Sequence, residues 1–187
     1  MNRPRPVVLA GPTAVGKGTI STYIRENFPQ VWLSISATTR PPRPGEIDGR
    51  HYYFVTAEQF DDMVERGDML EWALVHGRHR YGTPRHAVEQ AVADGRTPLL
   101  EIDLQGARQV RASMPEALFV FLAPPSWEEL IRRLIGRGTE GAEERRRRLE
   151  TARVEMAAAE EFDVVIVNDD VRRAAEELVS LMRSQEP

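Results

Sequence analysis

Residues 7–19 read VVLAGPTAVGKGT, an apolar run followed directly by a loop with the pattern GxxxxGK. The uninterrupted run 7–10 predicts a strand that is buried on both faces of a parallel sheet. Beyond the loop, Ile20 and Ile24 begin an apolar repeat that predicts a helix over about 16–27. A GxxxxGK loop between a buried strand and an amphipathic helix is the context of a phosphate-binding P-loop. We therefore predict a P-loop here, rather than a tight glycine turn without a ligand.

The chemistry of this loop points to a nucleoside triphosphate. Gly11 and Gly16 permit close backbone approaches that turn N–H groups toward phosphate oxygens. The positive end of the helix dipole adds to them, and Lys17 can contact the β and γ oxygens. Gly18 departs from the Ser or Thr that usually binds magnesium, which leaves Thr19 as the nearest hydroxyl. The residues expected to contact ATP here are Gly11, Pro12, Thr13, Ala14, Val15, Gly16, Lys17, Gly18 and Thr19.

Apolar segments return further along the chain, at 98–102, 118–122 and 163–167. Their composition is typical of strands in a parallel sheet, and stretches with helical spacing of apolar residues separate them. Strands that alternate with helices predict a doubly wound α/β fold, with a P-loop NTPase-type parallel sheet flanked by helices.

Residues 36–83 interrupt this alternation. The stretch TTRPPRPGEIDGR at 38–50 is too rich in proline, glycine and charge for regular structure, whereas 69–75 predicts a strand. Thr83 followed by Pro84 predicts the start of the next helix, with Thr83 as its N-cap. We expect a small, mostly extended insert of the kind that holds a second ligand.

Composition limits the class of protein. At 187 residues, with 41% hydrophobic residues, we expect a single globular domain. No apolar run approaches the roughly 20 residues that span a bilayer, and no signal peptide is evident, so we expect a cytoplasmic protein without a membrane role. The absence of cysteine excludes disulfides and thiol chemistry. The formal net charge of -4 argues against a nucleic-acid partner, while basic residues gather at 40–50, 78–85 and 132–148, as around a cavity for small anions.

Several motifs together resemble the guanylate kinase family. In chain order they are SISATTRPPRPGEIDGRHYYFV, LEWA, YGTP, EIDLQGARQV, LAPPS, GRGTE and VIVNDD, and the resemblance extends from Pro6 to about Leu181. Its most specific part is TTRPPRPGE together with Tyr52 and Glu71. The resemblance implies a kinase of purine nucleotide metabolism that converts ATP and GMP to ADP and GDP, with Mg²⁺ as cofactor. The subregions of the single domain 1–187 would be a core (1–35, 84–125 and 161–187), a GMP-binding insert (36–83) and a helical lid (126–160).

The acceptor site implied by the resemblance agrees with the chemistry of GMP. A nucleoside monophosphate has a doubly charged phosphate, so holding it beside ATP requires several cationic groups. Guanine offers N1–H and an exocyclic amine as donors where adenine has an acceptor at N1, so a carboxylate such as Glu71 favours guanine. An exposed strand carboxylate is the alternative interpretation of Glu71. The GMP-binding residues implied by the family are Ser36, Arg40, Arg43, Tyr52, Glu71, Tyr81, Thr83 and Asp103.

The resemblance also implies catalytic roles. The residues that match the catalytic cations of the family are Lys17, Arg43, Arg137 and Arg148. Cations of this kind neutralise charge on the transferring group and are worth roughly 10³–10⁵ in rate in related enzymes. A solvated helical face is the alternative for most of 145–148, and Arg145 is the nearest rival of Arg148. No general base is required, because the acceptor oxygen is already anionic.

Two further pairs of residues are implied as ligands. Thr19 and Glu101 are the expected magnesium ligands, and Asn168 with Asp169 matches the adenine-side contact of the family. The alternative for Asn168 and Asp169 is an N-cap of the last helix, and the alternative for Glu101 and Asp103 is an N-cap of the helix that starts near Gln105.

Two other functions compete with this interpretation. A P-loop kinase for another phosphorylated acceptor, such as ribose bisphosphate or AMP, is one, because GKGT also occurs in adenylate kinases. A guanylate-kinase-like module that binds peptides without catalysis is the other, although the presence of Lys17, Arg43, Arg137 and Arg148 argues against it. The sequence does not indicate an oligomeric state.

Overall fold

The strand that precedes the P-loop lies at the centre of a parallel sheet. The computed structural model describes residues 4–75, 77–135 and 141–185 of the chain. Its five-stranded sheet has the order β2-β7-β1-β8-β9, and each neighbouring pair is parallel. The strands are β1 (Val7–Ala10), β2 (Trp32–Leu33), β7 (Pro98–Glu101), β8 (Leu118–Ala123) and β9 (Val164–Val167). This confirms the predicted α/β fold and places the P-loop at the carboxyl edge of the sheet, where such folds bind ligands.

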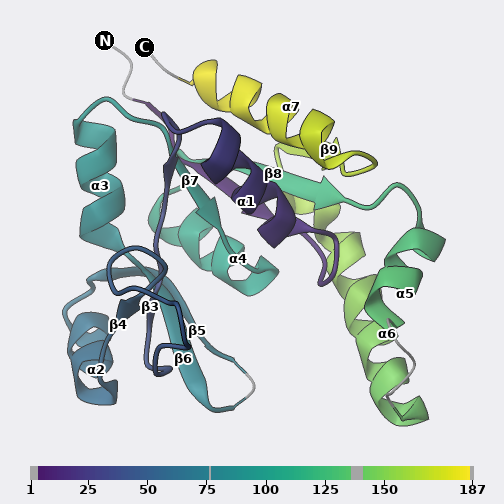
Figure 1. Ribbon diagram of the computed structural model, residues 1–187, viewed down its shortest axis with the longest axis horizontal. Helices are drawn as coiled ribbons and strands as arrows, with labels where there is room; N and C mark the ends of the chain where they lie inside the picture. The colour runs from purple at the N-terminus through teal and green to yellow at the C-terminus, as the bar shows by residue number, and fades with distance from the viewer. Residues whose placement is uncertain (1–3, 76, 136–140, 186–187) are drawn as a thin grey trace.

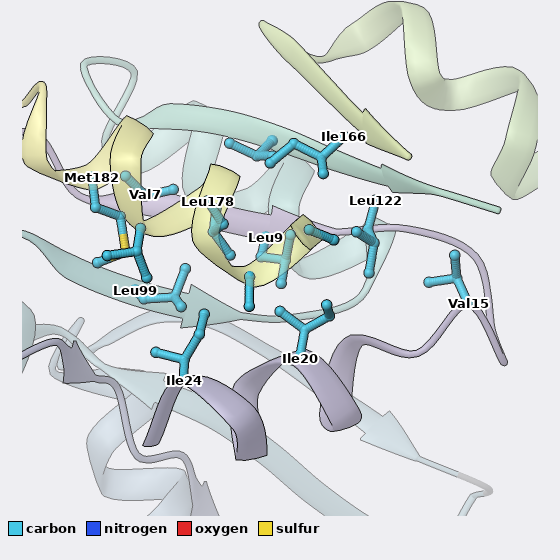
Figure 2. Close-up of a cluster of buried hydrophobic side chains, with 14 of the residues drawn as sticks. Val7, Leu9, Val15, Ile20, Ile24, Leu99, Leu122, Ile166, Leu178 and Met182 are labelled. Atoms are coloured by element: carbon cyan, nitrogen blue, oxygen red, sulfur yellow. The ribbon is translucent and has the colours of Figure 1, made fainter. Parts of the chain in front are cut away.

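Helices cover both faces of this sheet (Figure 1). On one face, Leu9 of β1 belongs to a buried cluster with Ile20 and Leu178 (Figure 2). On the other face, Val8 belongs to a cluster with Val110. Successive side chains of β1 thus enter opposite cores, which is why the strand is apolar throughout instead of alternating. The helices are α1 (Lys17–Asn27) and α7 (Val171–Arg183) on the first face, and α3 (Arg85–Ala93) and α4 (Leu104–Ser113) on the second.

A second, smaller sheet forms within the stretch that interrupts the alternation. It is four-stranded, with the order β4-β3-β6-β5, and β5 and β6 form an antiparallel hairpin. The second sheet has its own small core, which contains Ala37, Phe60 and Met69. A capping box of Thr56 with Gln59 begins the associated helix. The elements are β3 (Ala37–Thr38), β4 (Tyr53–Phe54), α2 (Ala57–Glu65), β5 (Met69–Val75) and β6 (His79–Pro84).

A pair of helices precedes the last strand of the main sheet. They are α5 (Trp127–Ile135) and α6 (Ala142–Ala157), and the short 3-10 helix η1 (Ala158–Glu161) leads from them into β9. Figure 1 shows that this pair and the second sheet extend from the parallel sheet as two separate arms. None of the helices in the described residues is long and apolar enough to cross a membrane.

One predicted helix boundary was wrong. Thr83 lies inside β6, and α3 begins at Arg85 with Pro84 as its N-cap residue. No side chain caps α3, and the Thr83 hydroxyl instead donates to Glu71 of the neighbouring strand. The Thr-Pro pattern therefore suggested an N-cap, whereas the Thr83 hydroxyl bonds across the β5–β6 hairpin to Glu71.

Candidate active site

Close backbone packing fixes the shape of the P-loop. A Cβ atom at Gly11 would lie 2.4 Å from the carbonyl oxygen of Leu122, and one at Gly16 would lie 2.7 Å from Nδ2 of Asn168. Gly16 also has a φ of 103°, a conformation that residues with a side chain rarely adopt, and it is the N-cap residue of α1. The loop therefore requires glycine at both positions, and its backbone N–H groups precede the positive end of α1.

Lys17 folds back over the loop that contains it. Its Nζ donates to the carbonyl oxygens of Gly11 at 2.6 Å and Pro12 at 3.3 Å. Burial lowers the pKa of Lys17, while the carboxylates of Glu155, Glu101 and Asp103 act in the opposite direction. The ammonium group is thus held at the loop and faces several anions, as a phosphate-binding cation would.

A carboxylate from α6 contacts the same loop. Oε2 of Glu155 accepts a hydrogen bond from the backbone N–H of Thr13 at 2.9 Å, and Oε1 accepts from the Thr13 hydroxyl at 3.3 Å. These donors belong to the segment in which successive N–H groups bind phosphate in P-loop proteins. An anionic group therefore lies against the loop.

Glu71 forms a second polar centre, on β5. Glu71 is only 6% exposed, and its Oε1 accepts a 2.6 Å hydrogen bond from the Thr83 hydroxyl. Burial raises the pKa of Glu71 to about 7, the Thr83 hydrogen bond opposes that shift, and Asp103 adds to it. The alternative of an exposed strand carboxylate is therefore wrong.

Arg40 organises a neighbouring group of aromatic and acidic side chains. It is 8% exposed, and its guanidinium donates to both oxygens of Glu46, each at 2.9 Å. Nε donates to the Tyr81 hydroxyl at 3.1 Å, and the guanidinium lies 5.3 Å from the centre of the Tyr52 ring. Hydrogen bonds from Arg40 and from the backbone N–H of Arg43 lower the pKa of Glu46 to about 2. The structure thus brings Arg40, Tyr52 and Tyr81 together.

The other residues that the resemblance implies for GMP binding lie just before β3, in the loop after Arg40 and at the start of α4. Ser36 directly precedes β3, and its carbonyl oxygen accepts from Tyr53. Arg43 lies in the exposed loop after Arg40. Asp103 is the N-cap of α4 and accepts from the backbone N–H of Gly106 at 2.7 Å. The capping role that competes with ligand binding is therefore real for Asp103. A Cβ atom at Gly106 would lie 3.1 Å from Oδ1 of Asp103 and 2.8 Å from Oε2 of Glu71, so these two carboxylates are also neighbours.

The proposed magnesium residues lie beside the P-loop. A Cβ atom at Gly18 would lie 3.9 Å from Oε1 of Glu101, so this carboxylate lies next to the position where a P-loop usually has its hydroxyl ligand. Thr19 follows in the first turn of α1. In the described part of the chain no three His, Cys, Asp or Glu side chains group around a metal position. Such sparse oxygen ligands fit Mg²⁺, which keeps most of its coordination for water and phosphate.

Asn168 and Asp169 lie at the end of β9, on the far side of the loop. Asn168 is 3% exposed and donates from Nδ2 to the carbonyl oxygen of Val15 at 2.9 Å, while its buried Oδ1 has no partner among the described residues. Asp169 pairs with Arg173. The N-cap of α7 is Asp170, so the capping alternative for Asn168 and Asp169 was wrong. A cavity of about 300 Å³ adjoins both residues and is lined also by Ala14, Gly16, Thr19, Arg133 and Val171.

The cations assigned to the lid are only partly described. Arg148 lies on α6, where it donates to Glu144 and to the carbonyl oxygen of Leu134 at the end of α5, each at 3.4 Å. Arg145, its predicted rival, lies exposed on the same helix. Arg137 lies outside the described residues. The structure therefore places Arg148 at the contact between α5 and α6.

Comparisons with known proteins agree with this geometry. A family model described as guanylate kinase matches residues 3–185. The chain belongs to the guanylate kinase family. A guanylate kinase of Leifsonia xyli subsp. xyli is 68% identical, with 94% of this chain and 69% of the relative aligned. A guanylate kinase of Cutibacterium acnes is 61% identical, with 94% of this chain and 88% of the relative aligned. A guanylate kinase of Nocardia farcinica is 60% identical, with 96% of this chain and 94% of the relative aligned.

Two solved structures have folds similar to that of this chain. The crystal structure of guanylate kinase from Anaplasma phagocytophilum superposes with a TM-score of 0.75 at 33% identity, covering 100% of this chain and 88% of that chain. An SH3-kinase fragment of tight junction protein 3 gives a TM-score of 0.50 at 13% identity, covering 99% and 58%. At that low identity the second likeness concerns the fold alone.

Sequence reasoning missed three polar residues of this guanylate kinase site. Glu46 lies within the TTRPPRPGE stretch, where the nearby arginines favour an ion pair such as the one it forms with Arg40. Arg133 borders the cavity beside Asn168 and donates to the carbonyl oxygen of Val15 at 3.2 Å. Glu155 lies far along the chain from Thr13, and no local pattern links the two residues. Only the packing of α6 near the P-loop shows that Glu155 belongs to the site.

Proposed function

We propose that this protein transfers the γ-phosphoryl group of ATP to GMP and so forms ADP and GDP. Membership in the guanylate kinase family supports a nucleotide kinase. The observation that supports guanine as the acceptor base is the buried carboxylate of Glu71. Thr83 donates to Oε1, and a carboxylate can accept further hydrogen bonds from the N1–H and the exocyclic amine of guanine. Adenine lacks that pair of donors, so with AMP the Glu71 carboxylate would keep only the hydrogen bond from Thr83 and gain none of those that guanine supplies.

The acceptor phosphate would bind at the group around Arg40. Arg40 and Arg43 supply positive charge, and the hydroxyls of Tyr52 and Tyr81 supply neutral donors. Glu46 holds the Arg40 guanidinium by two parallel hydrogen bonds, which fixes its plane before substrate arrives. Ser36, Thr83 and Asp103 would complete the acceptor site.

The donor phosphates would lie on the P-loop. Residues 11–19 present backbone N–H groups and the dipole of α1, and Lys17 would exchange the carbonyls of Gly11 and Pro12 for β and γ oxygens. Arg137 and Arg148 would add positive charge over the transferring group. Asn168 and Asp169 would contact the adenine side, where the buried Oδ1 of Asn168 lacks a protein donor among the described residues.

Magnesium fits the same edge of the sheet. Thr19 and Glu101 would hold the ion, directly or through its water ligands. When bound, Mg²⁺ would neutralise charge on the phosphate oxygens during transfer. The chain itself would do the positioning, and no side chain need remove a proton, because the attacking phosphate oxygen is already anionic.

The parts of the fold would divide this work. We assign 1–35, 84–125 and 161–187 to the core that holds the P-loop, 36–83 to the GMP-binding insert and 126–160 to the lid. The insert corresponds to the second sheet and the lid to the helix pair, and these are the two arms visible in Figure 1.

A comparison of acceptors tests the proposal. ADP release would be measured with ATP and Mg²⁺ in the presence of GMP, AMP or ribose 1,5-bisphosphate, and again without Mg²⁺. We expect kcat/KM for GMP to exceed that for AMP by about 10⁴, as for a site that hydrogen-bonds a polar edge. A higher kcat/KM for AMP or ribose bisphosphate than for GMP would show that GMP is not the acceptor substrate. Binding of GMP without any turnover would favour the non-catalytic module.

A further inference from the structure

The side chain of Gln109 pairs with the main chain of β5. Its Oε1 accepts from the backbone N–H of Trp72 at 3.0 Å, and its Nε2 donates to the Trp72 carbonyl oxygen at 2.9 Å. β5 is an edge strand of the second sheet, so this side of Trp72 has no neighbouring strand. The amide therefore satisfies one donor and one acceptor of the edge, as a residue of another strand would.

Other residues of α4 contact β5 at neighbouring positions. One turn before Gln109, a Cβ atom at Gly106 would lie 2.8 Å from Oε2 of Glu71. One turn after it, the Ser113 hydroxyl donates to the carbonyl oxygen of Leu70 at 3.2 Å. Positions 106, 109 and 113 lie on one face of the helix, and they meet three successive residues of the strand. The reciprocal pair at Gln109 lies in the middle of this contact.

The residues around the Glu71 carboxylate come from the two elements joined by this contact. Glu71 and Thr83 come from the hairpin β5–β6, whereas Asp103 and Gly106 come from the start of α4. α4 packs on the main sheet through Ala107 and Val110. The distance between the hairpin and α4 therefore sets where the Glu71 carboxylate lies relative to the core that binds ATP.

We infer that Gln109 is a positioning residue for the acceptor base. By pairing with Trp72 it fixes β5 along α4 at the register in which Glu71, the adjacent residue, lies against Gly106 and beside Asp103. This inference rests on the proposed function and extends it, because Gln109 acts on guanine through Glu71. Two directional hydrogen bonds define a register that apolar packing alone would leave free to slide.

The test compares Gln109→Leu with the wild type and with Gln90→Leu. Gln90 is an exposed glutamine on α3 whose amide bonds only to Asp94 in the described structure, so its loss controls for removal of a helical amide. We expect Gln109→Leu to raise KM for GMP about tenfold, the equivalent of about one hydrogen bond. KM for ATP should change less than about twofold, and the ratio of kcat/KM for GMP over AMP should fall. Gln90→Leu should match the wild type.

A double-mutant cycle separates positioning from general stability. If Gln109 acts through Glu71, Gln109→Leu should change KM for GMP less than about twofold in a Glu71→Gln background. Full additivity, or equal increases in both Michaelis constants, would overturn the inference. If Gln109→Leu does not fold, Gln109→Glu is measured in its place, because glutamate keeps the acceptor for the Trp72 N–H. Gln109→Glu should also raise KM for GMP and leave KM for ATP nearly unchanged. An unchanged KM for GMP in this variant would overturn the inference. A wild type inactive with GMP would instead refute the proposed function.

Discussion

The carboxylate of Glu155 bridges the backbone N–H and the hydroxyl of Thr13, at 2.9 and 3.3 Å. One residue belongs to α6, within the proposed lid, and the other to the P-loop. A carboxylate so placed repels the phosphates of ATP and also occupies donors of the loop. Under the proposed function, ATP bound at the P-loop would therefore displace Glu155 or move α6.

Replacing Glu155 tests this competition. Glu155→Gln keeps the size of the side chain and removes its charge, so we expect KM for ATP to fall by about threefold to tenfold, with KM for GMP nearly unchanged. The effect should shrink at high ionic strength because the interaction is partly exposed. Steady-state kinetics at two salt concentrations measure both quantities. Glu150→Gln, an exposed change on the same helix, is the control, and a higher KM for ATP in Glu155→Gln would contradict the prediction.

Removal of the Lys17 charge should abolish turnover and leave the fold intact. Lys17→Met retains most of the aliphatic stem, but it cannot stabilise charge on the transferring phosphoryl group, so kcat should fall by at least about 10³. The melting temperature should change little, because the ammonium bonds only to loop carbonyls in the described structure and its burial already opposes the charged form. Near-normal turnover would show that the loop does not bind the transferred phosphate.

All strands of the main sheet except β2 were predictable from local sequence, because each of them is a short apolar run next to a turn or a helix, whereas β2 is only two residues long. The P-loop strand needed only the run 7–10 and the GxxxxGK spacing. The second sheet was less predictable. β3 and β4 are only two residues long each, and their pairing depends on partners that are distant in sequence, such as Ala37 with Gly82. Strands that short have no periodicity from which they can be recognised.

The contacts within the candidate site were likewise not predictable from sequence. Motif matching selected Glu71, Arg40 and Lys17, and the structure supplies what surrounds them. The burial of Glu71 depends on the approach of α4, and the partner of Arg40 is Glu46, which lies in the same irregular loop. The bond between Glu155 and Thr13 joins residues separated by most of the chain. Such contacts arise from tertiary packing, which propensity and spacing do not encode.

Glu71→Gln should weaken GMP binding while it stabilises the free protein. Glutamine replaces one carboxylate oxygen by an NH₂ group, which cannot accept a hydrogen bond from the N1–H or the exocyclic amine of guanine. KM for GMP should therefore rise about a hundredfold, and KM for ATP should barely change. In the free protein, burial raises the pKa of Glu71 from 4.5 to about 7, so ionising it at pH 8 costs as much as about 3 kcal/mol of folding free energy.

Urea unfolding at two pH values checks the stability half of that prediction. The gain from Glu71→Gln should be largest at pH 8 and nearly vanish at pH 4, because below its ordinary pKa the wild-type carboxyl is protonated in both folded and unfolded states. A variant less stable than the wild type at pH 8 would contradict the argument. Equal increases in the two Michaelis constants would refute the base-reading role.

The affinity for GMP should depend on pH through Glu71. With a pKa of about 7, only about a tenth of the free protein has the ionised carboxylate at pH 6, and guanine prefers that form. KM for GMP should therefore fall about tenfold from pH 6 to pH 8 and level off above it. The GMP phosphate, with a second pKa of about 6, also titrates in this range and contributes about twofold. Glu71→Gln retains the phosphate titration alone, so kinetics of both proteins from pH 6 to pH 8 isolate the contribution of Glu71, and parallel profiles would exclude Glu71 as the titrating group.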